Sequence, residues 1–206
     1  MISGHTELSG FDKAKAVGFR FLFGVDEAGR GPLAGPVVAA AVCVRDHALG
    51  CRIGDSKLLT HTQREKAFPL IHAKAFVGVG VVSEKVIDEI NILRAAHLAM
   101  TIAVRDLSAR LTAAQADVKV LVDGNSYRGE IPYEVECVVK GDSKSFAIAC
   151  ASIIAKVTRD RMMDEYDALY PQYGFAAHKG YPVPAHYDAL RKCGPAPIHR
   201  RSFRLV

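Results

Sequence analysis

Four acidic side chains occupy positions from which they could hold metal ions together. Asp26 and Glu27 are adjacent and close a β-type apolar run, Asp123 closes another such run, and Asp142 stands just before a long helical pattern. Each acid alone has an ordinary structural explanation, as a charged turn for the pair, a turn for Asp123 and a helix N-cap for Asp142. Their coincidence is more informative, because an α/β sheet gathers its ligands at strand ends and helix starts.

Metal-assisted phosphodiester hydrolysis is the chemistry that such a cluster favours. Four neighbouring carboxylates repel one another and resist ionising together unless cations are present. Hard oxygen ligands select Mg²⁺ or Mn²⁺ over softer metals. Two such ions, roughly 3.5–4 Å apart, can activate a water on one side of a phosphorus and stabilise the leaving oxygen on the other. We therefore expect a site that needs no side-chain nucleophile.

The elements that must position these acids follow from the hydrophobic pattern. Runs of β-branched and aromatic residues predict strands, and apolar residues that recur near the helical period predict helices. Strands followed by strands and then by alternating helices are typical of an α/β domain with a mixed sheet flanked by helices. The predicted strands cover Phe19–Asp26, Pro36–Arg45, Ala75–Ser83, Val118–Asp123 and Val135–Lys140, and the predicted helices cover Glu84–Ser108, Ser143–Tyr170 and Ala185–Lys192.

Length and composition favour one globular domain. A chain of 206 residues that is 50% hydrophobic can bury a core without metal or disulfide support. Residues 1–18 show no clear period and are expected to form a mobile arm, which leaves residues 19–206 as the domain. The five widely spaced cysteines indicate neither a disulfide framework nor a thiolate zinc site, so we expect reduced thiols.

Charge and hydropathy indicate the partners and the location. The net charge of +5 favours a polyanionic partner. No apolar run is long enough to span a bilayer, and the first 20 residues lack the apolar stretch of a signal peptide. We therefore expect a cytoplasmic protein that does not contact membranes.

Several motifs resemble those of type 2 ribonuclease H (ribonuclease HII) and occur in the order seen in that family. The similarity extends from Phe19 to Phe203. It implies a ribonuclease H-like fold and the activity of a metal-dependent endoribonuclease. The motifs are Asp26-Glu27-Ala28-Gly29-Arg30-Gly31, Asp55-Ser56-Lys57-Leu58-Leu59, Asn91-Ile92-Leu93, Leu121-Val122-Asp123-Gly124-Asn125, Lys140-Gly141-Asp142, Ala151-Ser152-Ile153-Ile154-Ala155-Lys156-Val157-Thr158-Arg159-Asp160 and His178-Lys179-Gly180-Tyr181.

The resemblance implies a role for each candidate site residue. In the family, the segment matching Gly29-Arg30-Gly31 reads the ribose 2′-hydroxyl and its phosphate, and the tyrosine matching Tyr181 packs on the sugar at the RNA-to-DNA junction. Closely approaching backbone groups and an arginine can make such hydrogen bonds. The acids implied to be catalytic and to bind two Mn²⁺ or Mg²⁺ ions are Asp26, Glu27, Asp123 and Asp142. Possible phosphate contacts are Lys57, Lys144, Lys156, Lys179, Arg200 and Arg201.

Three other polar residues are expected to be structural. Asp160 lies inside a predicted helix beside two arginines, which favours an ion pair. His178 and His199 are expected at the surface or hydrogen-bonded in the core, because a metal mechanism does not need them.

The expected substrate is an RNA–DNA hybrid or duplex DNA that contains a ribonucleotide. The protein is expected to cut on the 5′ side of a single ribonucleotide, leaving 5′-phosphate and 3′-hydroxyl ends, and so to serve ribonucleotide excision repair during DNA replication. The alternatives are a related ribonuclease H that needs several consecutive ribonucleotides and a non-catalytic nucleic-acid-binding domain. We expect a monomer. Leu58 replaces a lysine of many relatives, which puts one phosphate contact in doubt and does not affect the metal site. We expect no long extension after Phe203, so binding to a sliding clamp is unsupported.

Overall fold

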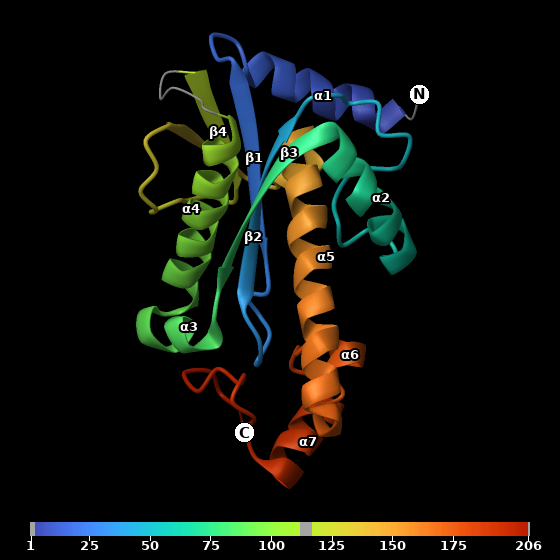
Figure 1. Ribbon diagram of the computed structural model, residues 1–206, viewed down its shortest axis with the longest axis vertical. Helices are drawn as coiled ribbons and strands as arrows, with labels where there is room; N and C mark the ends of the chain where they lie inside the picture. Colours follow the sequence, from blue (N-terminus) through green and yellow to red (C-terminus); the bar gives the residue numbers. More distant parts are fainter. Residues whose placement is uncertain (1–2, 112–116, 206) are drawn as a thin grey trace.

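One five-stranded sheet forms the centre of the computed structural model, which describes residues 3–111 and 117–205. The strand order is β3-β2-β1-β4-β5 (Figure 1). The first three strands in the sequence pair antiparallel, whereas β4 pairs parallel with β1, and β5 pairs parallel with β4. The strands are β1 (Phe21–Ala28), β2 (Val37–Val44), β3 (Ala75–Val82), β4 (Val118–Asp123) and β5 (Glu134–Val138).

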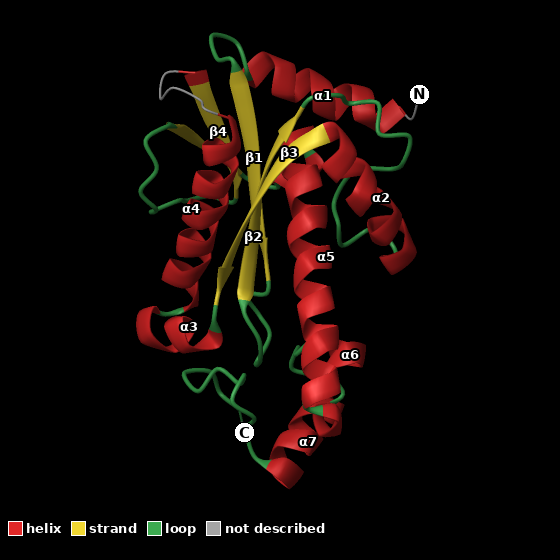
Figure 2. Cartoon of the chain, viewed as in Figure 1, coloured by secondary structure: helices red, strands yellow, loops and turns green. Residues whose placement is uncertain are grey.

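Helices cover both faces of this sheet, with α4 on one face and α5 on the other (Figures 1 and 2). The mixed sheet with flanking helices confirms the predicted fold class. The helices are α1 (Ser3–Lys15), α2 (His61–Lys74), α3 (Glu84–Ile90), α4 (Ile92–Leu111), α5 (Phe146–Leu169), α6 (Phe175–His178) and α7 (Pro184–Cys193), with 3₁₀ turns η2 (Gly141–Ser143) and η3 (Pro171–Tyr173).

Strand β2 divides its side chains between two apolar cores because successive residues of a strand point to opposite faces. Ala39 and Ala41 belong to the core beneath α4, and Ala40 and Val42 to the core beneath α5. All four are fully buried. A strand covered on both faces has no polar side and therefore reads as a continuous apolar run.

Glycines let the helices approach the sheet at backbone distance. A Cβ added at Gly24 of β1 would lie 2.2 Å from the carbonyl carbon of Ala147 in α5. A Cβ at Gly80 of β3 would lie 2.0 Å from the carbonyl oxygen of Ala99 in α4. Because both neighbours are backbone atoms, neither could give way without moving a helix.

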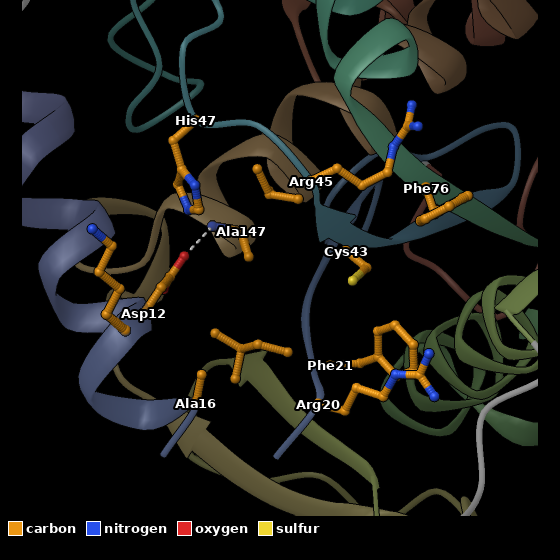
Figure 3. A pocket seen from close by; sticks show the side chains of 12 residues that line it. Asp12, Ala16, Arg20, Phe21, Cys43, Arg45, His47, Phe76 and Ala147 are labelled. Carbon is orange, nitrogen blue, oxygen red and sulfur yellow. Dashed lines mark hydrogen bonds between the residues drawn. The ribbon is translucent and has the colours of Figure 1, made fainter. Parts of the chain in front are cut away.

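The first helix packs on the domain. Leu8 is buried in the core beneath α5, and the Asp12 carboxylate accepts a hydrogen bond of 2.8 Å from the amide of Ala147 (Figure 3). The sequence pattern did not predict this helix. The boundary between residues 1–18 and the domain 19–206 stays a prediction, and the Asp12 contact offers a way to test it.

The predicted elements and the observed ones differ in two further places. The single helix predicted over Glu84–Ser108 is wrong, because Asn91, with a φ of 67°, separates α3 from α4. Helix α2 was not predicted, although Thr60 and Gln63 form a reciprocal capping box at its start.

The cysteines and the helix lengths can be described directly. All five cysteines are free, and Cys43, Cys51 and Cys150 are buried whereas Cys193 is exposed. Within the described ranges, every helix is too short or too polar to cross a membrane.

Candidate active site

Two of the predicted acids meet because β1 and β4 are parallel neighbours. Val25 pairs with Val122 in the register of these strands, so the next residues, Asp26 and Asp123, lie side by side. Glu27 follows Asp26 within β1. The carboxyl ends of two adjacent strands thus present three carboxylates at one edge of the sheet.

The turn before α5 adds the fourth acid. The amide of Gly141 donates a hydrogen bond of 2.6 Å to Asp123 Oδ1, which ties η2 to the end of β4. Asp142, the next residue, is 5% exposed, and its Oδ2 lies 3.7 Å from Lys57 Nζ. The structure therefore brings all four predicted acids into one region.

Burial raises the pKa of the Asp26 carboxyl well above its ordinary value, and the charges of Glu27 and Asp123 raise it further. The Ser152 hydroxyl and the amide of Glu27, which donates at 2.7 Å, oppose this shift. These bonds do not remove the cost of holding the charge, because neither group carries a positive charge. The site therefore favours either a proton or a cation at Asp26.

The other two shifted acids follow the same pattern. Burial raises the pKa of Glu27, and the Arg30 guanidinium, 3.3 Å away, opposes the rise. Burial also raises the pKa of Asp142, as do Asp55 and Asp123, against the opposing charge of Lys57. The charges of Arg30 and Lys57 do not offset the burial of Glu27 and Asp142, which marks the region as one that would gain from bound metal.

The donor set fits hard divalent cations. In the parts of the chain that are described, no three side chains of Asp, Glu, His or Cys converge to hold one ion between them. Mg²⁺ is usually held by one or two carboxylates together with waters and substrate phosphates. An open arrangement of paired carboxylates therefore fits ions that share their coordination with a phosphodiester.

A cavity of about 250 Å³ joins Asp26, Glu27 and Asp123 to the predicted substrate-reading residues, and Asp142 lies outside its lining. A Cβ built at Gly31 would lie 3.6 Å from the Tyr181 ring, so the turn and the tyrosine form adjacent walls. Tyr181 is 38% exposed, and Lys156 Nζ lies 5.7 Å from its ring centroid. The lining comprises Asp26, Glu27, Ala28, Gly29, Arg30, Gly31, Ser56, Lys57, Arg64, Asp123, Ser152, Lys156 and Tyr181.

The predicted phosphate contacts separate into four groups. Lys57 and Lys156 line the cavity, and Lys144 and Arg201 are exposed outside its lining. Lys179 forms an ion pair with Asp164 instead of lining the cavity. The phosphate contact expected of Arg200 is wrong, because its side chain is fully buried and all three guanidinium nitrogens donate to backbone carbonyls.

The three residues expected to be structural make hydrogen bonds within the fold. Asp160 accepts a hydrogen bond of 2.7 Å from Lys156 one helical turn away. His199 is buried and lies 3.0 Å from His186 between their Nε2 atoms, and His178 Nε2 lies 2.8 Å from the Tyr173 carbonyl oxygen.

Sequence reasoning gave no separate role to the serines beneath the acids. The hydroxyls of Ser56 and Ser152 lie 2.8 Å apart, and the Ser152 hydroxyl also hydrogen-bonds Asp26. Arg64 Nη1 donates to the Ser56 carbonyl at 2.9 Å. Both serines stand in motifs of the family resemblance, which was the available signal.

A larger cavity of about 410 Å³ lies at the opposite end of β1, between α1 and the start of that strand (Figure 3). Asp12, Arg20, Arg45 and Phe76 line it. It contains none of the predicted site residues, so its size does not make it the candidate active site.

Comparisons with known proteins agree with this geometry. The family model described as Ribonuclease HII matches residues 23–206. The ribonuclease HII of Ruminiclostridium cellulolyticum is 52% identical over 192 residues, which cover 93% of this chain and 72% of that protein.

Two solved structures share the fold. The ribonuclease H2 of Pyrococcus horikoshii aligns with a TM-score of 0.71 and 29% identity, covering 90% of this chain and 94% of that one. The ribonuclease HII of Archaeoglobus fulgidus, solved in complex with PCNA, aligns with a TM-score of 0.70 and 25% identity, covering 89% and 95%. These matches confirm the ribonuclease H-like fold, and the chain belongs to the ribonuclease HII family of metal-dependent endoribonucleases.

Proposed function

We propose that this protein hydrolyses the RNA strand of RNA–DNA hybrids and cuts on the 5′ side of single ribonucleotides in duplex DNA. The products carry 5′-phosphate and 3′-hydroxyl ends, as expected when water attacks the phosphorus, the bond to the 3′-oxygen breaks and that oxygen leaves as a hydroxyl. The observation that carries the proposal is the single cavity that joins Asp26, Glu27 and Asp123 to Gly29-Arg30-Gly31 and Tyr181.

The acids serve as ligands for two divalent cations, Mn²⁺ or Mg²⁺. Bound there, the ions supply positive charge for the developing transition state and lower the pKa of attacking water. Asp26 and Asp123 would hold the same ion, because they lie side by side across β1 and β4. The Ser152 hydroxyl orients the Asp26 carboxylate, and the Gly141 amide orients that of Asp123.

The walls of the cavity select the ribonucleotide. The glycines of the turn allow the backbone to approach the 2′-hydroxyl, which is the only group that distinguishes one ribonucleotide from a deoxynucleotide sugar. The Tyr181 ring, in contact distance of the turn, packs on the neighbouring sugar and disfavours a second hydroxyl there. Lys57, Lys144 and Lys179 contribute phosphate attraction along the duplex.

We further propose that the protein acts as a cytoplasmic monomer in ribonucleotide excision repair. Independence from a sliding clamp stays a prediction, since the Archaeoglobus fulgidus relative was solved in complex with PCNA.

End-labelled duplexes test the proposal. One duplex carries a single ribonucleotide, one carries several in a row, and one is all DNA, each incubated with Mg²⁺, Mn²⁺ or EDTA. Asp26→Asn is the inactive variant, and Asp188→Asn, an exposed α7 acid paired with Arg191, is the matched control. We expect metal-dependent cutting on the 5′ side of the lone ribonucleotide by the wild type and the control alone.

The other outcomes decide between the alternatives. Cutting confined to the duplex with several ribonucleotides would retain the metal mechanism and refute the single-ribonucleotide specificity. Retention of duplex affinity in EDTA with no cutting in any metal would indicate a non-catalytic binding domain.

A further inference from the structure

Two arginines next to the active site are buried without a carboxylate partner. Arg159 of α5 and Arg200, which follows α7, are both 0% exposed. Neither guanidinium takes part in an ion pair among the described residues. Burial lowers the pKa of Arg159 to about 10 and that of Arg200 to about 9, so both stay cationic at neutral pH. Two buried charges are costly unless dipoles satisfy them.

Backbone carbonyls of the turn after β1 provide those dipoles. Arg200 makes five hydrogen bonds, which use the full donor capacity of a guanidinium. Arg159 donates to the same segment and also, at 3.0 Å, to the carbonyl of Lys179 beside Tyr181. The Arg200 acceptors are Gly29 (2.6 Å), Arg30 (3.1 Å), Pro32 (2.8 Å), Gly35 (2.9 Å) and Pro36 (3.1 Å), and the other Arg159 acceptors are Ala34 (3.1 Å) and Pro36 (3.0 Å).

This pattern fixes the direction of two amide groups. In a trans peptide the C=O and N–H bonds point in opposite directions. With the carbonyls of Gly29 and Arg30 held by Arg200, the N–H groups of Arg30 and Gly31 point away from the guanidinium. In the described part of the chain neither N–H is a hydrogen-bond donor, and both residues line the cavity that holds the acids.

Gly29 shows how closely the arginines fit beneath the turn. Its φ is +99°, and a Cβ built there would lie 2.2 Å from Arg159 Nε. A side chain at this position would displace the guanidinium as well as strain the backbone. The absence of a side chain at Gly29 therefore allows the close approach of Arg159 on one side of the turn, in addition to that of a ligand on the other.

We propose that Arg159 and Arg200 are positioning residues for ribonucleotide recognition, holding the turn so that the amides of Arg30 and Gly31 form an anion-binding cradle in the cavity. The cradle takes the phosphate that adjoins the ribose, and Arg159 keeps it aligned with Tyr181 through the Lys179 carbonyl. This inference rests on the proposed function of Gly29-Arg30-Gly31. Neither arginine touches the substrate.

The test compares Arg200→Lys with the wild type. A lysine keeps the charge but offers a single nitrogen, so it cannot hold five carbonyls. Arg161→Lys is the matched control, because Arg161 lies two residues from Arg159 on the same helix and pairs with Glu65 on the surface. The measurement is the ratio of dissociation constants for all-DNA and single-ribonucleotide duplexes, taken with Ca²⁺ in place of Mg²⁺ to prevent cutting.

We expect Arg200→Lys to lower this ratio by about tenfold, the equivalent of one lost hydrogen bond, and Arg161→Lys to leave it unchanged. A smaller fraction of folded protein would weaken the binding of both duplexes equally, so the ratio of their dissociation constants would not change. An unchanged ratio in a folded Arg200→Lys protein would overturn the inference. If that variant does not fold, Arg159→Lys, which gives up three carbonyl contacts, is measured and judged in the same way.

A neutral methylphosphonate beside the ribose gives an independent measurement. It should weaken binding to the wild type more than binding to Arg200→Lys, because in that variant the amides that bind the charged phosphate are already misplaced. Equal losses of affinity in the two proteins would contradict the proposed cradle. A wild-type protein that binds both duplexes equally would instead refute the proposed function itself.

Discussion

Replacing Asp12 by asparagine should stabilise the protein, because this carboxylate is ionised in a place that disfavours its charge. Asp12 is 4% exposed, and its Oδ1 is buried without a hydrogen-bond partner. Burial raises its pKa from 3.8 to about 6, although hydrogen bonds from Ser145 and the amides of Ala147 and Phe146 oppose the rise. The folded state therefore binds this proton more tightly than the unfolded state.

The sign and size of the effect follow by linkage. Stability falls as the pH rises from about 4 to about 6, where the unfolded chain has lost the proton and the folded chain retains it. Above pH 7 the full difference between pKa 3.8 and about 6 applies, which amounts to about 3 kcal/mol. Asparagine avoids this cost and keeps a carbonyl oxygen for the Ala147 amide, so Tm should rise by roughly 6–12 °C.

Thermal and urea unfolding at pH 5, 6, 7 and 8 measure the prediction. The gain of Asp12→Asn should be largest at pH 7 and 8 and should shrink toward pH 5, where the wild type becomes protonated. Equal stability of the two proteins at pH 8 would refute the reasoning. That result would also be expected if residues 1–18 were a detached arm, so the experiment tests the proposed boundary as well.

Three further predictions concern the active site and the packing of the sheet. Asp26→Asn and Asp142→Asn should each abolish cleavage while leaving Tm of the metal-free protein unchanged or higher, since burial raises the pKa of both acids; turnover at the wild-type rate in either variant would remove that acid from the site. Tyr181→Ala should spread the cleavage positions on a labelled duplex more than it weakens binding, because phosphate contacts supply most of the affinity; a uniform loss of binding with unchanged positions would argue the reverse. Gly80→Ala should cost about 1–3 kcal/mol or more in urea unfolding, since its Cβ would lie 2.0 Å from an α4 carbonyl oxygen, whereas Gly10→Ala, with nothing within 4 Å, should stabilise α1.

Strands β1 to β4 could be predicted because at least half of the residues in each are buried. Strand β2, buried at seven consecutive positions, can only read as an apolar run. The pairing of β1 with β4 could not be read in the same way, since it depends on contacts between segments almost 100 residues apart. Helix α2 was missed for a different reason: only Ala67 and Ile71 are buried along it, and Pro69 lies inside it, so the sequence carries little helical periodicity.

The acids of the site could be predicted from the sequence, whereas the arginines that hold the Gly29-Arg30-Gly31 turn could not. Asp26 and Asp123 sit at strand ends that the hydrophobic pattern marks out. Arg200 was interpreted as a phosphate contact because arginines are seldom fully buried. Nothing local distinguishes it from Arg201, which is exposed; the difference arises only when the chain after α7 returns to the turn after β1 and its carbonyls meet the guanidinium.

The rates at which the free thiols react with an alkylating reagent can report partial unfolding of the protein. A buried thiol reacts with an alkylating reagent only when its surroundings open, so the labelling rate measures the free energy of that opening. The buried Cys43 lies in β2 and the buried Cys150 in α5, with the partly buried Cys137 in β5 and the exposed Cys193 as an internal reference. Burial raises the pKa of the Cys150 thiol well above its ordinary value, so the closed state contributes almost no thiolate to the reaction. Mass spectrometry of labelled peptides could thus rank the sheet and the helix that frames the active site by their rates of opening, with no cysteine added to the sequence.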